Sequence, residues 1–553
     1  MPFGPQLRRW LASPAAAVFA LALVSYAYFY QAGGWNQNVR FALVRALVEQ
    51  HTARLDAYHG STRDLSCQAS RHRPCADPTR PDAGRDEHYY CDKAPGAQLL
   101  AVPAYAAMHL VAGSDAPSPE YLAVTSFLVT IWTVGLPAAL AVWMLYWLLA
   151  ALGLRPWARA AAALAYGLGT LALPYATLYY GHQLAAALLL IGFAILVRAR
   201  RDPGAPPTAW RMALCGLALG GAVAVEYPAA LAAAAIGSYA LAFVRPWPRV
   251  AWLVAGALVP ALATAAYHWI VFGGPATLPY EFSIQGNRSQ GWFMGLGVPD
   301  SKAVAHLLFT GYRGLFYSAP WLLLAVPGAI RLWRRGCRAE VGVCAAVFAL
   351  FVSLNGSLVD WNGGWAFGAR YLVPAIPFLA VLAAGVLLEP AARGWRAVWI
   401  GGGLAAALSV LLMLAATAVK PEVPDGYIAP TRRAVKIERP FTEFLLPSFW
   451  RGELAVNSQG IHQAGAPRRG PAFVGRRWAF NLGEALGLRG KTSLLPLGLL
   501  WAAGGWWLLW AVRRKRDSLT PSSHSSPEAG EELLPTPHAD PASNDASSIG
   551  RAT

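Results

Sequence analysis

The sequence predicts an all-α polytopic membrane protein, and three observations lead to this. Of its 553 residues 56% are hydrophobic, which is more apolar surface than one soluble core can bury. It contains 23 Trp and 21 Tyr, side chains that favour the membrane interface. The net charge of +17 comes from short arginine clusters between apolar runs. This charge pattern indicates cytoplasmic loops and argues against a nucleic-acid partner.

The apolar run over residues 11–30 is predicted to be the first span. It follows Arg8 and Arg9, as the apolar part of a signal peptide would. However, it is nearly of membrane length, and no clear small-residue cleavage site precedes the polar stretch 31–37. We therefore expect a retained helix.

Helical spans from residue 155 onward fit in pairs between successive basic clusters, if all clusters lie in the cytoplasm. The predicted pairs are about 160–177 with 183–199, 210–226 with 229–244, 250–272 with 313–330, 340–357 with 370–388, and 397–418 with 494–512. Residues 96–150 fit less well, because they offer two apolar segments where an odd number of crossings is needed. Either segment 96–111 is re-entrant or the cluster at Arg155 and Arg159 lies outside. The total is about 12 or 13 transmembrane helices.

This topology predicts one multi-span membrane domain, residues 1–513, with its long polar segments on the non-cytoplasmic face. Those segments are 33–95, 179–183, 226–228, 273–311, 355–370 and 420–491. The first outer loop is 33–95, and a large outer loop, 419–493, precedes the last span. Residues 514–553 are rich in Ser, Pro and acidic residues after their basic start, so we expect a disordered cytoplasmic tail.

Three of the six cysteines, Cys67, Cys75 and Cys91, lie in the first outer loop. An oxidising compartment would permit one disulfide there and leave one thiol over. A zinc site with His72 and His88 is the alternative, although the spacing matches no standard pattern.

Asp92 and Lys93 stand side by side directly before an apolar run. Charge at a membrane boundary is unfavourable unless it is paired or binds a ligand. Lys93 is therefore a candidate phosphate contact. The alternative is an interfacial anchor whose side chain reaches to water.

Two segments resemble the start of GT-C superfamily glycosyltransferases, in the protein O-mannosyltransferase and aminoarabinose transferase branch. Gln37-Asn38-Val39-Arg40-Phe41 stands where that family shows an Asp-Glu-x-Arg-Tyr element. Tyr90-Cys91-Asp92-Lys93-Ala94-Pro95 stands where it shows an aromatic-acid-Lys-Pro element. The resemblance covers roughly the first 230 residues. It implies a GT-C-like helix bundle that takes a sugar from a polyprenyl-phosphate donor. We assign Arg40 and Lys93 to the donor phosphate, and Tyr90 to sugar or acceptor binding.

The family's acidic positions read Gln37 and Asn38 here, and an amide cannot accept a proton near neutral pH. A rebuilt catalytic site must therefore use other titratable groups. The catalytic candidates are Asp56, Glu226, His182 and Asp92, with Asp64 also in the loop and Asp56 or Glu226 preferred.

The segment from Asp360 to Tyr371 carries two Trp, one Asp, one Arg and four Gly at the mouth of a predicted span. Arg370 can grip a phosphate through its planar guanidinium. Trp361, Asn362 and Trp365 are candidates for sugar or acceptor binding, because Trp rings stack on sugar faces. The alternative interpretation is an interfacial aromatic belt around a tight loop.

The resemblance thus implies a membrane glycosyltransferase that moves a sugar, with inversion, from a polyprenyl-phosphate donor to a lipid, glycan or protein acceptor outside the cytoplasm. We expect a bacterial-type inner membrane location. No phosphate loop, zinc-protease motif, nucleophile elbow or dinucleotide fingerprint is present. A divalent metal remains open. The alternatives are a lipid-linked sugar transporter or flippase, and a non-catalytic GT-C relative.

Overall fold

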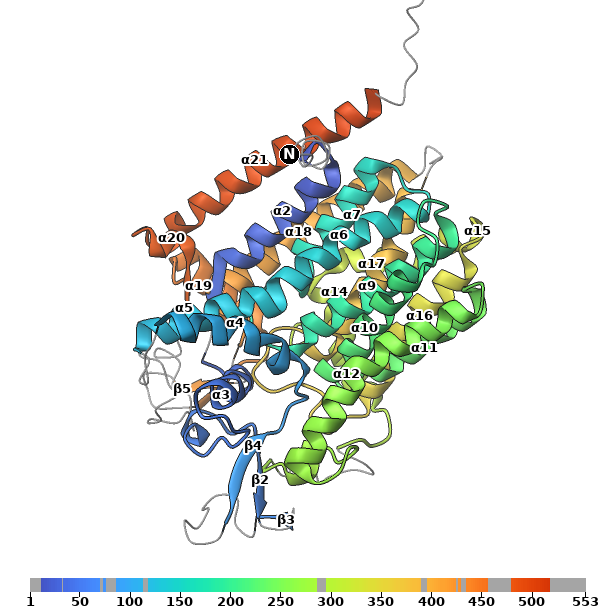
Figure 1. Cartoon of the computed structure of the whole chain (residues 1–553). Coiled ribbons are helices and arrows are strands. Elements are labelled where there is room, and N and C mark those ends of the chain that lie inside the picture. Colours follow the sequence, from blue (N-terminus) through green and yellow to red (C-terminus); the bar gives the residue numbers. More distant parts are fainter. Residues whose placement is uncertain are drawn as a thin grey trace, which may run out of the picture.

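The computed structural model of the chain is a bundle of membrane-length helices with small elements gathered at one end (Figure 1). It describes residues 11–31, 33–69, 73–75, 86–112, 118–285, 295–388, 395–423, 426–428, 434–455 and 479–517. In this part of the chain seven helices are long and apolar enough to cross a membrane, and four shorter ones are apolar. The predicted class, an all-α polytopic membrane protein, is confirmed.

The main helices follow the predicted spans closely. They are α2 (Pro14–Tyr28), α4 (Gly96–Ala112), α5 (Pro119–Thr130), α6 (Leu136–Ala151), α7 (Pro156–Leu168), α8 (Ala172–Ala176), α9 (Gly181–Arg201), α10 (Ala209–Val225), α11 (Ala229–Phe243), α12 (Pro248–Phe272), α15 (Ala325–Arg334), α16 (Arg338–Gly356), α17 (Ile376–Ala384), α18 (Trp395–Val419) and α21 (Leu495–Asp517). Apolar runs predict these positions, because a segment that lies in lipid must satisfy its backbone hydrogen bonds internally and therefore forms a helix.

Two predicted single spans are broken into shorter pieces. The span expected at 160–177 is α7 followed by α8, and the span expected at 313–330 is α14 (Leu315–Ser318), η5 (Pro320–Leu324) and α15. Pro320 opens the second break, since proline lacks the amide hydrogen that would continue a helix. Periodicity does not reveal such breaks.

The difficult region 96–150 becomes α4, of 17 residues, and one continuous helical stretch of 32 residues, Glu120–Ala151. The second stretch joins α5 to α6 through a π-helical turn, Ile131–Gly135. The predicted tail begins four residues early, because α21 continues to Asp517, and residues 518–553 lie outside the described residues.

Helix packing depends on glycine where two helices approach closely. A Cβ on Gly216 of α10 would lie 1.8 Å from the Leu253 carbonyl oxygen of α12, and one on Gly256 would lie 1.9 Å from the Ala213 carbonyl oxygen. Small residues let membrane helices pack closely in the absence of a hydrophobic driving force between them.

Arginines from separate basic clusters meet at one end of the bundle. Arg200 and Arg201, at the end of α9, contact Glu340 at distances of 3.0 and 2.7 Å. Arg331 of α15 donates to the Leu388 carbonyl. This meeting agrees with the expectation that these clusters share one face of the membrane.

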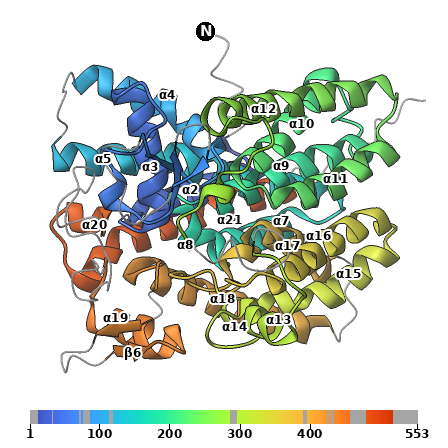
Figure 2. The ribbon, with the colours of Figure 1, turned by 90° about the horizontal axis from the view of Figure 1, so that it is seen from below.

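The opposite end carries α3 (Trp35–Glu49), a sheet in the order β3-β2-β4, and α19 (Leu446–Arg451) with α20 (Leu482–Ala485); Figures 1 and 2 show α3, α19 and α20 away from α15 and α16. The strands are β2 (Leu65–Ala69), β3 (Arg73–Pro74) and β4 (His88–Cys91). Two small antiparallel pairs complete this end: β1 (Phe29–Gln31) with β7 (Ala479–Asn481), and β5 (Gly426–Ile428) with β6 (Ala434–Lys436).

The expected single disulfide is present between Cys67 and Cys75, and Cys91 is the buried thiol left over. His88 does not join these cysteines but lies 2.8 Å from Asp56. Among the described residues no group of three or more His, Cys, Asp or Glu side chains is arranged to hold a metal ion, and His72 lies outside them.

Candidate functional site

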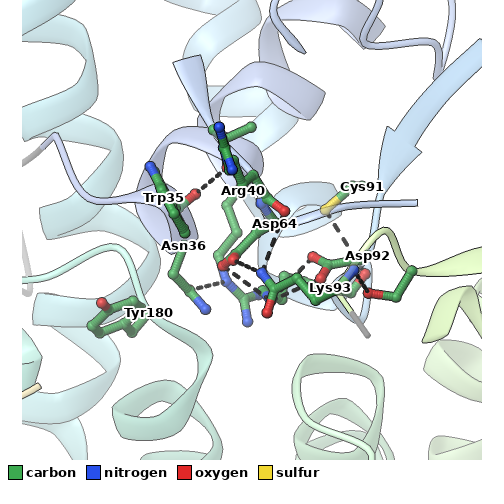
Figure 3. A network of polar contacts seen from close by, with 12 residues as sticks. Trp35, Asn36, Arg40, Asp64, Cys91, Asp92, Lys93 and Tyr180 are labelled. Carbon is green, nitrogen blue, oxygen red and sulfur yellow. Dashed lines mark hydrogen bonds and ion pairs between the residues drawn. The ribbon is translucent and has the colours of Figure 1, made fainter. Parts of the chain in front are cut away.

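Lys93 lies between two carboxylates. Its Nζ is 3.0 Å from Asp64 Oδ2 and 3.1 Å from Asp92 Oδ1, and Figure 3 shows it pointing to both. The strand register explains the arrangement, because Leu65 pairs with Cys91, so the residues flanking that pair, Asp64 and Asp92, come together. Lys93 is therefore a paired cation, as charge at a membrane boundary requires.

Asp64 also accepts a hydrogen bond from Gln285 Nε2 at 2.6 Å. Burial by itself would raise the pKa of this carboxyl, but the charges of Lys93 and Arg370 and the two hydrogen bonds outweigh it and hold the pKa below its ordinary value. Asp64 is accordingly ionised near neutral pH. The Gln285 contact brings the segment after α12 into the site.

Arg40, Glu226 and His182 form a second group. Arg40 reaches inward from α3, where its Nε donates to Asn36 one turn earlier at 3.0 Å. Its Nη2 donates to Glu226 Oε1 at 2.9 Å, and His182 Nδ1 lies 3.5 Å from the same oxygen. Arg40 is 1% exposed, so this ion pair is shielded from solvent.

Gly181 makes room for that group. A Cβ at this position would lie 2.2 Å from Glu226 Oε1 and 3.0 Å from Arg40 Nη2. Gly181 opens α9, and the missing side chain lets the carboxylate approach the start of the helix.

Arg370 stands at the start of the 3-10 turn η6 (Arg370–Ala375), which leads into α17. Its Nη2 donates to the Tyr371 hydroxyl at 3.1 Å, and its guanidinium carbon lies 5.6 Å from the centre of the Tyr180 ring. No described carboxylate pairs with it, and its Nε is buried without a hydrogen-bond partner in the described part of the chain. It differs in this from Lys93 and Arg40.

The loop before Arg370 is held by buried contacts. Arg313, which is 1% exposed, donates to the carbonyls of Gly364 and Ala366. Asn362 accepts from the Gly364 amide at 3.2 Å, and Trp361 stacks on His306 at 5.3 Å. These contacts fix the loop's conformation.

The remaining predicted candidates lie as follows. Trp365 is half-buried in the same loop. Tyr90, also half-buried, lies edge-on to Phe272 of α12 at 5.9 Å. Asp56 accepts from the Tyr89 amide at 2.8 Å and contacts His88, so its carboxylate is engaged along β4 rather than with Lys93.

Glu422 is a residue that the sequence analysis did not single out. It follows α18 by three residues, is 5% exposed, and accepts hydrogen bonds from the Tyr180 hydroxyl and from Gln37 Nε2, the latter at 3.0 Å. Burial raises its pKa, although Lys420 and the two hydrogen bonds act in the opposite direction. A charged pair directly after an apolar run, Lys420 and Glu422, is the same signal that identified Asp92 and Lys93.

All six polar segments expected on one face contribute to this connected region. The contributing residues are Lys93 with Asp64, His182 with Tyr180, Glu226, Gln285, Arg370 and Glu422. Aromatic rings surround this region. Ring centres lie 5.8 Å apart for Tyr175 and Tyr180, 6.0 Å for Tyr180 and His182, and 5.5 Å for His182 and Tyr371.

Neither a family model nor a curated protein matches the chain by sequence. Among solved structures the chain is similar to ArnT from Cupriavidus metallidurans bound to undecaprenyl phosphate, with a TM-score of 0.45, 16% identity, and coverage of 90% of this chain and 75% of that one. The apo state of the same ArnT matches with a TM-score of 0.42 and 15% identity, over 89% of this chain and 73% of that one. The apo oligosaccharyltransferase of Archaeoglobus fulgidus gives 0.40 and 12%, over 72% of this chain and 56% of that one.

Proposed function

We propose that this protein transfers a sugar from a polyprenyl-phosphate donor to an acceptor at the outer face of a bacterial-type inner membrane. The acceptor is a lipid, glycan or protein that offers a nucleophilic group on that face. The proposal rests on the position and charge of Arg370.

Arg370 favours an anionic ligand, because it is a cation without a described carboxylate partner. It lies at the end of the bundle opposite the arginine clusters. The two ends are separated by α9, whose 21 residues span about 30 Å. A polyprenyl phosphate keeps its chain in the bilayer and its phosphate at this level, where a planar guanidinium can bind two phosphate oxygens.

In the proposed reaction the acceptor oxygen forms a bond to the anomeric carbon while the bond from that carbon to the phosphate oxygen breaks. The bonding electrons leave with the phosphate, and Arg370 and Lys93 stabilise the developing charge. The acceptor proton passes to the group formed by Glu226 and His182. We assign the proton to this group because Glu226 Oε1 contacts both His182 Nδ1 and the buried Arg40.

A transfer assay with purified protein and radiolabelled polyprenyl-phosphate sugars tests this function. Arg370→Gln and Lys93→Met should each reduce transfer about 100-fold or more, because each removes a cation from the leaving phosphate. Arg451→Gln and Lys302→Met are matched controls at exposed positions and should retain wild-type transfer.

Wild-type rates in both Arg370→Gln and Lys93→Met would contradict these roles. Movement of a labelled lipid-linked sugar across vesicle membranes without any transfer product would instead identify a flippase. Absence of both activities over a broad donor panel would identify a non-catalytic protein.

A further inference from the structure

Arg370 is separated from two carboxylates by one tyrosine each. The Tyr180 hydroxyl donates to Glu422 while its ring lies beside the guanidinium. On the other side, the Tyr371 hydroxyl accepts from Arg370 and donates to Asp360 Oδ2 at 3.2 Å. The negative charges are thus held near Arg370, but neither occupies its hydrogen-bond donors.

Glu422 is fixed in this position from several sides. Gln37 donates to its second oxygen, and Gln37 is itself fixed by accepting the Tyr179 amide at 3.0 Å. Gly34 admits the carboxylate, because a Cβ there would lie 2.0 Å from Glu422 Oε1. The next residue, Val423, accepts from the amide of Ala366 in the loop before Arg370, at 3.1 Å.

Two other cations of this region already have direct carboxylate partners. Arg40 pairs with Glu226, and Lys93 pairs with Asp64 and Asp92. A direct carboxylate partner on Arg370 would compete with a phosphate for the same N–H groups. A carboxylate one ring away lowers the local positive potential instead, and buried charges act over such a distance with little screening.

We propose that Glu422, with Asp360 in a weaker second role, is a spaced counter-charge that limits the affinity of Arg370 for polyprenyl phosphate and so allows this product to leave. The inference rests on the proposed function, since it assumes that Arg370 binds the phosphate. Glu422 is a positioning and tuning residue, because it contacts Tyr180 and Gln37 and acts on the ligand through its charge.

Glu422 is buried, but its neighbours favour its charged form. Burial raises its pKa, while Lys420 and Arg370 favour the charged form. Glutamine has the shape of the neutral acid, so Glu422→Gln should fold. Its amide oxygen can accept from Gln37 and its amide nitrogen can donate to the Tyr180 hydroxyl oxygen, so both contacts can be kept while the charge is removed. Asp360 is half-buried, so its charge is more strongly screened by solvent.

The test measures the dissociation constant of undecaprenyl phosphate for the purified full chain in lipid nanodiscs. Glu422→Gln should bind about tenfold more tightly, since a negative charge near the phosphate is removed. Asp360→Asn should change in the same direction by a smaller factor. In turnover, Glu422→Gln should show stronger inhibition by added undecaprenyl phosphate and a lower kcat without a higher KM. A role only in folding would not produce tighter binding.

Glu453→Gln is the matched control, because Glu453 is exposed and pairs with Arg451, and it should bind as the wild type does. Equal or weaker binding by both Glu422→Gln and Asp360→Asn would overturn the inference. If Arg370→Gln still loses binding in that case, the proposed phosphate contact stands and only the counter-charge fails. If Arg370→Gln binds as tightly as wild type, the proposed phosphate contact fails, and the counter-charge inference with it.

Discussion

The two ends of α9 use buried charge in opposite ways. At its C-terminal end, Glu340 is 1% exposed and receives hydrogen bonds from Arg200, Arg201 and Tyr239. At its N-terminal end, the described cation Arg370 contacts two tyrosines and no described carboxylate. The first arrangement is complete in itself and joins three helices, α9, α11 and α16. The second leaves donor capacity for a ligand, so the comparison separates a structural charge cluster from a binding site.

The largest effect should come from removing the Glu340 carboxylate at the C-terminal end of α9. Glu340→Ala leaves two arginines without their shared carboxylate, and the free energy of unfolding should fall by about 3 kcal/mol. Thermal denaturation in detergent measures this loss. Transfer per folded molecule should stay at the wild-type level; a selective loss of transfer would mean that the two ends are coupled.

A smaller effect is expected from adding a methyl group at Gly181, at the N-terminal end of α9. In Gly181→Ala the new methyl group displaces the Glu226 carboxylate from Arg40, so transfer should fall about tenfold, equivalent to about 1.4 kcal/mol. Gly221→Ala on α10 is the control, since its Cβ would meet only ordinary van der Waals contact. Equal activity of both variants would show that Glu226 needs no fixed position.

Arg370→Gln should change stability by less than about 1 kcal/mol, although it removes a half-buried charge. Removing Arg370 separates no described ion pair, whereas Glu340→Ala leaves Arg200 and Arg201 without their carboxylate. Thermal denaturation of the two variants side by side gives the comparison. A loss as large as that of Glu340→Ala would show that Arg370 is a structural cation.

The smallest effect concerns Asp64, whose pKa is lowered in the fold, since Lys93 and Arg370 outweigh the effect of burial. A carboxyl with a depressed pKa contributes stability above its ordinary value of 3.8, and this contribution is lost as the pH falls through the lower pKa of the folded state. Between pH 5 and 8 we expect no slope from this group. Melting temperatures of wild type and Asp64→Asn should therefore converge only in strong acid, and convergence near neutral pH would contradict the ion pair.

Much of the site could be predicted from the sequence, because charge beside an apolar run is rare unless it has a purpose. This reasoning found Lys93, Glu226 and Arg370, which the fold brings into one region. For the catalytic base it preferred Asp56 or Glu226; the Asp56 carboxylate contacts His88, and its role stays a prediction. The same reasoning passed over Glu422 inside the large loop 419–493. Much of that loop lies outside the described residues, so its expected role as a separate outer element stays a prediction.

The sequence by itself determined the class of protein, the positions of most helices and the ends at which polar residues gather. It did so because hydropathy and arginine placement are local properties that the bilayer reads directly. Only the tertiary structure decided which charges are neutralised. Whether Arg40 meets Glu226, or Arg370 meets the Tyr180 ring and the Tyr371 hydroxyl, depends on distances between helices that are far apart in the chain, and no local pattern encodes those distances.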